Sequence, residues 1–310
     1  YSGSRGLGDV YKRQSYMFDD VDHAAALFNL ERGGHIYSRM SNPTVQVLEE
    51  RVCALEGGTA ALATASGMSA IFLTIMTLCN AGDHMVVSSQ LYGGTVNLFR
   101  LTLPKFGIKT TFVKPRDTEG FKKAIQPNTK GIFGELVGNP GNELMNMPEV
   151  SNIAKEAGIP LIIDSTYQTP YLCRPFEHGA DLVVHSLTKW MSGNGSSMAG
   201  ILVEGGTFDW MQNDKFPSMT EPYEGYHGLS FAEEFGPTAF TMMARAEGMR
   251  DMGPCLAPQN AWNILHGLET LSLRMEKHCS NALKMVEYLS NHESVAWVSH
   301  ASAPGHPDKE

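Results

Sequence analysis

The feature that most constrains the fold is a regular alternation of short apolar segments with segments of helical spacing. The apolar segments include "PLIIDST" and "ADLVVHSLTK", and the helical ones include "TVQVLEERVCAL" and "EVSNIAKEAGI". Strands that are joined through helices form βαβ units, whose strands run parallel and are buried on both faces. We therefore expect an α/β fold, with a mostly parallel sheet flanked by helices.

Composition and charge argue against several classes of protein. The 310 residues carry a net charge of -9, and the 24 Lys and Arg are scattered, so no nucleic-acid surface is expected. The five cysteines form no CxxC pair and the histidines show no metal-binding spacing, so we predict no metal site. No apolar run is long enough to span a bilayer and no signal peptide is recognisable, which favours no membrane association and a cytoplasmic location.

The two ends of the chain differ from the patterned sequence between them. Residues 1–14, "YSGSRGLGDVYKRQ", show no periodicity and are interpreted as a non-native or assembly remnant. Residues 207–237 are rich in Pro, Gly and aromatic residues and are interpreted as an elaborated loop or linker. The run "VAWVSH" at 295–300 is strand-like but lacks partners, so we expect the chain to be a fragment.

Charged and polar residues follow the apolar segments at three places, Asn139, Asp164 and the stretch from Ser186 to Lys189. In parallel α/β sheets, ligands bind beyond the carboxyl ends of the strands. A carboxylate or an ammonium group at a partly buried strand end is costly unless it meets a partner or a ligand. Pyridoxal phosphate would satisfy both, because its aldehyde can join Lys189 and its ring nitrogen can pair with Asp164.

A phosphate group would also find donors in this sequence. Ser186 and Thr188 are expected two residues apart on one face of a strand, and the "SGM" at 66–68 is expected at a helix N-terminus. Tyr92, in "LYGG", is placed to stack on a ring. Taken singly, each has an ordinary structural explanation, such as a turn former, a solvated lysine, a helix start or a packing residue. Their joint occurrence at the strand ends favours a cofactor site.

Five segments resemble, in the same order, motifs of the Cys/Met-metabolism family of pyridoxal-phosphate enzymes. They are "IYSRMSNPTVQVLEERVCALEGG", "ASGMSAI", "SSQLYGGT", "DSTYQTPYLCRPFEHGADLVVHSLTKW" and "GLETLSLRMEKHCSNALKMVEYL". The resemblance implies the fold type I arrangement of aspartate aminotransferase and a homotetramer of two catalytic dimers. It also implies an N-terminal arm and helix at 15–57, a cofactor-binding large domain at 58–257, and a helical linker with a truncated C-terminal domain at 258–310.

The resemblance assigns roles to individual residues. Lys189 would form the Schiff base and carry protons, and Asp164 would pair with the ring nitrogen. Tyr92 would stack on the ring and take part in acid/base chemistry. The remaining assignments are the phosphate ligands Gly67, Met68, Ser186 and Thr188, the ring-hydroxyl contact Asn139 with Glu135 nearby, and Tyr37 and Arg39, which would reach the phosphate of the neighbouring subunit.

Within the family, two features are similar to the sulfhydrylase branch, which forms homocysteine and acetate from O-acetylhomoserine and sulfide. They are the long segment after "SLTKW" and Gly94, where methionine γ-lyases carry a cysteine. The alternatives are a cystathionine γ-synthase, a methionine or cystathionine γ-lyase, and a catalytically dead fragment. Asn194 and Ser165 depart from the His and Asn that are common in the branch, and we expect them to affect substrate fit.

Overall fold

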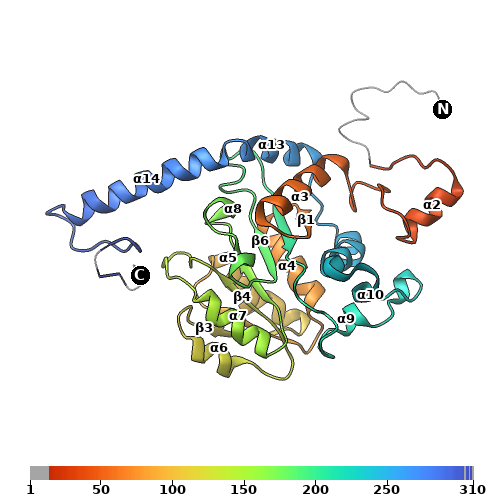
Figure 1. The fold of residues 1–310 in the computed structure, drawn as a ribbon, viewed down its shortest axis with the longest axis horizontal. Helices are drawn as coiled ribbons and strands as arrows, with labels where there is room; N and C mark the ends of the chain where they lie inside the picture. The colour runs from red at the N-terminus through yellow and green to blue at the C-terminus, as the bar shows by residue number, and fades with distance from the viewer. Residues whose placement is uncertain (1–13, 304, 307, 309–310) are drawn as a thin grey trace.

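The computed structural model describes residues 14–303, 305, 306 and 308, and its centre is a seven-stranded sheet (Figure 1). The strand order is β1 (Ala60–Thr64), β7 (Gly200–Glu204), β6 (Leu182–His185), β5 (Leu161–Asp164), β4 (Thr129–Glu135), β2 (His84–Ser88) and β3 (Lys109–Val113). β7 is antiparallel to both neighbours, whereas the pairs from β6 to β3 are parallel. The expectation of a mostly parallel sheet is therefore confirmed.

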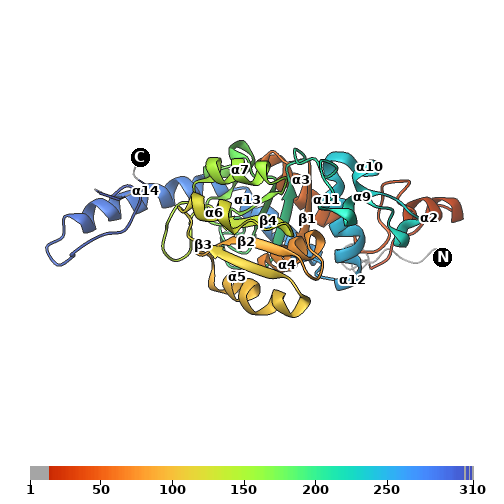
Figure 2. The same ribbon diagram turned by 90° about the horizontal axis from the view of Figure 1, so that it is seen from below.

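Helices cover both faces of this sheet. Figure 2 shows α4 (Gly67–Leu78) and α5 (Gly93–Asn97) on one side, and α6 (Thr118–Ala124) and α7 (Met147–Glu156) on the other. Every residue of β2, β6 and β7 is buried. Strands covered on both faces are expected to be apolar without alternation, which is the pattern seen in the sequence.

The helices next to the sheet begin and end at capping residues. The Asn42 side chain accepts a hydrogen bond from Thr44 N, Pro43 begins α3 (Pro43–Glu56), and Gly57 ends it in the left-handed conformation. Each of these residues suits its position, since Asn caps free N–H groups and glycine adopts positive φ without strain. α3 packs on β1 at the edge of the sheet.

For three segments the structure changes or narrows the interpretation of the sequence. Residues Ala60–Thr64, for which no strand was predicted, form the edge strand β1, which pairs with β7. Residues 207–237 form an elaborated, packed loop segment and not a linker, because Trp210 stacks on Phe240 with ring centroids 5.2 Å apart and packs edge-on against Phe216. Residues 295–300 are not a strand, because they form no regular structure.

The segment between β7 and the C-terminal helices contains several short helices. They are α9 (Pro217–Thr220), α10 (Phe231–Phe235), α11 (Ala239–Met243), a π-helix (Ala244–Met249) and α12 (Arg250–Met252). Phe231 and Phe240 of this segment are fully buried. This segment therefore adds to the core of the sheet domain.

The two ends of the described chain extend from the body of the molecule. α2 (Val21–Phe28) lies on one side, and α13 (Pro258–Leu268) leads into the long α14 (Leu271–Ser290), which projects on the other (Figure 1). The interpretation of residues 1–14 as a remnant falls, apart from Gln14, outside the described residues. Within the described part, none of the helices has the length and apolarity required to cross a membrane.

Candidate active site

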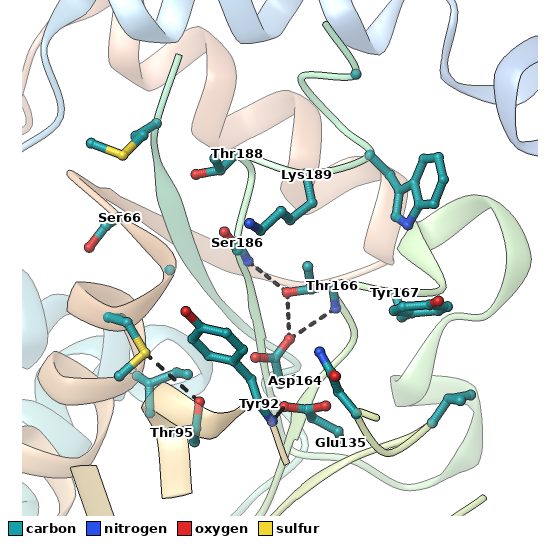
Figure 3. Close-up of a pocket in the computed structure, with 18 of the residues that line it drawn as sticks. Ser66, Tyr92, Thr95, Glu135, Asp164, Thr166, Tyr167, Ser186, Thr188 and Lys189 are labelled. Atoms are coloured by element: carbon teal, nitrogen blue, oxygen red, sulfur yellow. Dashed lines mark hydrogen bonds between the residues drawn. The ribbon is translucent and has the colours of Figure 1, made fainter. Parts of the chain in front are cut away.

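A cavity of about 580 Å³ lies at the carboxyl ends of β4, β5 and β6 (Figure 3). Eight of the ten residues predicted as site residues line it. They are Gly67, Met68, Tyr92, Asn139, Asp164, Ser186, Thr188 and Lys189. Glu135, expected nearby, also lines the cavity. Segments more than 100 residues apart in the sequence therefore meet where the sheet topology predicts a ligand.

One wall of the cavity is the N-terminus of α4. The Ser66 hydroxyl caps this helix by accepting a hydrogen bond from Ser69 N at 3.1 Å. Gly67 is the first helical residue, and a Cβ placed on it would lie only 2.6 Å from Ser186 Cβ. Because glycine permits this approach, the free N–H groups at the start of α4 and the Ser186 side chain face the same volume, which suits a phosphate.

The opposite wall holds Asp164, at the end of β5. Its Oδ1 atom accepts hydrogen bonds from Thr166 N at 3.0 Å and from Thr166 Oγ1 at 2.5 Å. Thr166 Oγ1 in turn accepts a hydrogen bond from Ser186 N at 2.7 Å. Burial raises the pKa of Asp164 above its usual range, and the bonds from Thr166 and the charge of His185 act against that rise.

Glu135 is the second acid of the site and lies beside Asp164 in the register of β4 and β5. Its Oε1 atom accepts a hydrogen bond from Tyr92 N at 2.6 Å. Burial, and secondarily the charge of Asp164, raise the pKa of Glu135 to about 8. The raised pKa favours the protonated form of Glu135, which limits the negative charge that the two neighbouring carboxyl groups carry together.

Lys189 is placed differently from the prediction. β6 ends at His185, and Ser186 to Lys189 form a turn in which Lys189 N donates a hydrogen bond to Ser186 O at 3.2 Å. Ser186 and Thr188 therefore do not share a face of a strand, and the Lys189 side chain is exposed in the cavity rather than partly buried. Within the described part of the chain, no hydrogen bond or ion pair engages Lys189 Nζ.

Thr188 ties this turn to β7. Its Oγ1 atom donates a hydrogen bond to Ala199 O at 3.2 Å and accepts one from Ala199 N at 3.1 Å. The hydroxyl proton of Thr188 is thus engaged with the backbone, although the side chain lines the cavity. A role as a phosphate donor would require this proton to turn toward the ligand.

Tyr37 and Arg39 do not reach the cavity of their own chain. Arg39 Nη1 donates a hydrogen bond to Arg250 O, and the Arg39 guanidinium lies over the Tyr37 ring at 5.4 Å from its centroid. Neither side chain is among those that line the cavity. Their expected contact with the phosphate of a neighbouring subunit stays a prediction.

The two departures within the sequence motifs also lie outside the cavity lining. Asn194 is exposed, and its Oδ1 atom accepts hydrogen bonds from Ser192 Oγ at 3.2 Å and Ser196 Oγ at 2.9 Å. Ser165 is fully buried behind Asp164. An effect of either residue on the substrate would therefore be transmitted through the loops that they support.

Thr166 is a site residue that was not predicted from the sequence. It lines the cavity and links Asp164 to the backbone of Ser186 through its hydroxyl group. The only sequence signal was a hydroxyl residue two positions after a strand-end aspartate. This spacing is common in turns, because Asp side chains often bond to the backbone two residues on.

The residues of the cavity fit pyridoxal phosphate. The close approach at Gly67 leaves a helix N-terminus open to a phosphate, the Lys189 amine extends into the cavity, and the carboxylate of Asp164 lies buried across from it (Figure 3). A cationic ring nitrogen would stabilise the charged form of Asp164, which burial alone disfavours. The ring of Tyr92 projects into the same volume (Figure 3).

Comparisons with known sequences agree with this fit. The model of the family described as "Cys/Met metabolism PLP-dependent enzyme" matches residues 7–310. The chain is 51% identical over 299 residues to the O-acetyl-L-homoserine sulfhydrylase of Leptospira meyeri, covering 94% of this chain and 67% of that protein. It is 46% identical over 299 residues to the homocysteine synthase of Schizosaccharomyces pombe, covering 96% of this chain and 70% of that protein.

Solved structures with the same fold are also known. A putative O-acetylhomoserine (thiol)-lyase from Campylobacter jejuni superimposes with a TM-score of 0.93 at 39% identity, over 96% of this chain and 74% of that one. That structure contains N'-pyridoxyl-lysine-5'-monophosphate. The O-acetylhomoserine sulfhydrylase of Wolinella succinogenes superimposes with a TM-score of 0.78 at 36% identity, over 87% of this chain and 76% of that one.

Proposed function

Because this chain belongs to the Cys/Met metabolism family of PLP-dependent enzymes, we propose that it replaces the acetate of O-acetyl-L-homoserine with sulfide, forming L-homocysteine. The observation that carries the proposal is that Lys189, Asp164 and the N-terminus of α4 face one another in one cavity. The names of relatives that are 51% and 46% identical support the choice of substrate and product.

The residues that would hold the cofactor are those that the family resemblance implies, and their place in the cavity lining supports these roles. Lys189 would bind the aldehyde carbon, Asp164 would pair with the ring nitrogen, and Tyr92 would stack on the ring. Gly67, Met68, Ser186 and Thr188 would hold the phosphate, and Asn139 would contact the ring hydroxyl. When bound, pyridoxal phosphate withdraws electrons from the substrate amine and so makes the protons on neighbouring carbons removable.

Lys189 is the residue that can move these protons. Nζ would take the proton from Cα of O-acetylhomoserine and then one from Cβ. Acetate would leave from Cγ with the electrons of its C–O bond, hydrosulfide would add at Cγ, and Lys189 would return protons to Cβ and Cα. The sum converts O-acetylhomoserine and hydrosulfide into homocysteine and acetate.

Thr166 and Glu135 support this chemistry because they influence the negative charge that faces the ring nitrogen. Thr166 holds Asp164 Oδ1 with two hydrogen bonds, which leaves Oδ2 available to the ring nitrogen. A protonated Glu135 avoids a second negative charge beside Asp164. Together they keep one anion positioned for the cofactor.

The proposal is tested by an assay of the purified protein with added pyridoxal phosphate. Homocysteine and acetate should appear in equal amounts from O-acetylhomoserine and sulfide, and Lys189→Ala should abolish the reaction. O-succinylhomoserine, cysteine and methionine serve as competing substrates. Formation of cystathionine from cysteine, or of ammonia and 2-oxobutyrate, in place of homocysteine would contradict the sulfhydrylase assignment.

The assembly and location are proposed on the same basis. We propose a homotetramer of two catalytic dimers, as the family resemblance implies, and a cytoplasmic location without a nucleic-acid or membrane partner, as the charge and the apolar pattern of the sequence favour. Size-exclusion chromatography with light scattering measures the mass of the assembly. A monomer that retained full activity would contradict the proposed sharing of residues between subunits.

A further inference from the structure

The turn that carries Lys189 is held from outside the cavity by the C-terminal helices. Inside the turn, Lys189 N donates to Ser186 O at 3.2 Å and Gly193 N donates to Lys189 O at 2.8 Å. These two bonds fix the backbone of Lys189 relative to β6 and to the loop that follows. They leave the carbonyl group of Trp190, which follows Lys189 and also lines the cavity, without a partner inside the turn.

Arg274, in the first turn of α14, binds this carbonyl group. Arg274 Nη1 donates a hydrogen bond to Trp190 O at 2.7 Å, directly after Lys189 in the chain. Arg274 Nη2 donates to Gly267 O at 2.7 Å, and Nε donates to Thr270 Oγ1 at 3.1 Å. The planar guanidinium group thus joins the lysine turn to the junction between α13 and α14 through three hydrogen bonds.

The residues around Arg274 leave space for its guanidinium group beside the loop that follows Lys189. Gly193 has a φ of +74°, and a Cβ placed on it would lie 2.3 Å from Arg274 Cζ, so the guanidinium occupies space that only glycine leaves. One helical turn further along α14, the His278 ring packs against the Trp190 ring with centroids 4.7 Å apart. Two residues on the same face of α14 therefore contact the residue that follows Lys189.

The charged guanidinium group of Arg274 donates hydrogen bonds to backbone carbonyl oxygens and forms no ion pair within the described residues. In the part of the chain that the structure describes, the ion pairs of arginine involve Arg51, Arg116, Arg174, Arg245 and Arg250, and none involves Arg274. A charge-assisted hydrogen bond to a carbonyl is roughly twice as strong as a neutral one, so the bond to Trp190 O restrains the turn strongly.

We propose that Arg274 is a positioning residue for Lys189, which sets where the amine lies relative to the cofactor by holding the backbone of Trp190. The inference rests on the proposed role of Lys189 as the lysine that binds pyridoxal phosphate. It assigns to α14 a direct effect on the reactive amine, although α14 contributes no side chain to the cavity lining described above.

The test compares Arg274→Gln and Arg274→Lys with Arg51→Gln. Arg51 is a matched control, because its guanidinium bonds to Glu269 at the same helix junction but does not contact the lysine turn. Two properties of the holoprotein are measured. They are the dissociation constant for pyridoxal phosphate and the pH midpoint of the change in absorbance of the bound cofactor.

Arg274→Gln should raise the dissociation constant about tenfold and move the pH midpoint by about half a unit, because the amine loses its fixed position. Arg274→Lys should fall between this variant and the wild type, since a lysine keeps the charge but not the planar set of donors. Arg51→Gln should stay within about twofold of the wild type, as exposed ion pairs contribute little.

The inference is overturned if Arg274→Gln lowers only the melting temperature and leaves both cofactor properties at the level of Arg51→Gln. If Arg274→Gln does not fold, wild-type values in Arg274→Lys overturn it instead. Borohydride reduction of the wild-type holoprotein, followed by peptide mass spectrometry, separates this result from failure of the proposed function. A label on a residue other than Lys189 refutes the proposed function, whereas a label on Lys189 with unchanged Arg274 variants refutes only the role of Arg274.

Discussion

At the scale of single residues, the site is governed by two carboxyl groups on neighbouring strands. Glu135 and Asp164 are direct partners in the register of β4 and β5, and burial raises the pKa of both. Asp164 receives two hydrogen bonds from Thr166 that favour its charged form, and Glu135 receives backbone hydrogen bonds from Tyr92 and Asn139. The charge of Asp164 in addition raises the pKa of Glu135, so we expect Asp164 to meet a cationic ring and Glu135 to remain neutral.

The raised pKa of Glu135 predicts how the stability of the cofactor-free protein depends on pH. In the unfolded chain Glu135 ionises near pH 4.5, whereas in the folded chain it ionises near pH 8. Between these values the folded state binds more protons, so the free energy of unfolding should fall as pH rises from about 4.5 to about 8. The contribution of this one group is up to a few kcal/mol, on the order of 1.4 kcal/mol per pH unit.

Glu135→Gln should therefore flatten the decline in the free energy of unfolding between pH 5 and pH 8, as measured by urea titration at several pH values. Glu149→Gln, which alters an exposed carboxylate on α7, is the control and should leave the pH dependence as it is in the wild type. An unchanged slope in Glu135→Gln would show that Glu135 is already ionised at low pH in the folded protein.

At the scale of secondary-structure elements, the contact between the start of α4 and the lysine turn can be tested through Gly67. A Cβ at this position would lie 2.6 Å from Ser186 Cβ, so Gly67→Ala must push the helix N-terminus and the turn apart. We expect the affinity for pyridoxal phosphate to fall at least tenfold, which corresponds to about 1.4 kcal/mol of lost binding free energy. Fluorescence titration of the apoprotein with the cofactor measures this change.

Gly93→Ala provides the matched control for this experiment. Gly93 is also the first residue of a helix beside the cavity, but a Cβ placed on it has no atom within 4 Å. It should bind pyridoxal phosphate with nearly wild-type affinity. Equal losses of affinity in both variants would mean that the effect comes from the helix propensity of alanine and not from the contact with Ser186.

The elements also show which parts of the fold the sequence could predict. The mostly parallel sheet was predictable because short apolar strands and periodic helices alternate clearly along the chain. The end of β6 was not, because Leu187 is fully buried and extends the apolar pattern beyond His185, although the backbone already turns at Ser186. β1 was missed because its small residues have weak strand propensity, and its pairing with β7 is a contact between distant segments.

The predicted residues of the site differ from the missed ones in the same way, by whether their role depends on a contact between distant segments. Lys189, Asp164 and Asn139 follow strand ends, where the topology alone predicts a ligand. Thr166 and Arg274 act through hydrogen bonds to groups that are neighbours only after folding. No spacing in the sequence could reveal these contacts, since each depends on where two loops or a helix and a loop are brought together.

At the scale of the whole molecule, one partly buried ion pair joins the N-terminal arm to the sheet domain. Arg245 Nη2 lies 2.8 Å from Glu49 Oε2 in α3, and Arg245 Nη1 donates a hydrogen bond to Met40 O at 2.7 Å. Glu49 Oε1 also accepts a hydrogen bond from Ala63 N of β1 at 2.8 Å. The pair therefore fixes the arm, α3 and the edge strand together.

Arg245→Met should lower the free energy of unfolding by about 3 kcal/mol, because it leaves the carboxylate of Glu49 buried without its cation. Adding Glu49→Gln to this variant should recover part of the loss, since the amide removes the unpaired charge and still accepts a hydrogen bond from Ala63 N. Urea unfolding of the single and double variants measures both effects. A double variant less stable than Arg245→Met would contradict this explanation.

The position of Tyr37 and Arg39 leads to a prediction about the assembly. Both lie outside the cavity of their own chain, so any contact with a phosphate must be made in the site of another subunit. Lys189→Ala and Arg39→Ala homo-oligomers should then each show little activity. In a hybrid dimer of the two, the site that combines an intact Lys189 with an intact Arg39 from the other chain is complete.

Co-expression of Lys189→Ala and Arg39→Ala chains with different affinity tags tests this arrangement. Random pairing makes half of the dimers hybrids with one complete site of two, so about one quarter of wild-type activity should return in the unfractionated mixture. The doubly tagged hybrids, purified on both tags, should reach about one half. If Arg39 served the site of its own chain, no hybrid would contain a complete site, because each chain would lack one of the two residues. Hybrids as inactive as the parent variants would therefore place the function of Arg39 within a single subunit.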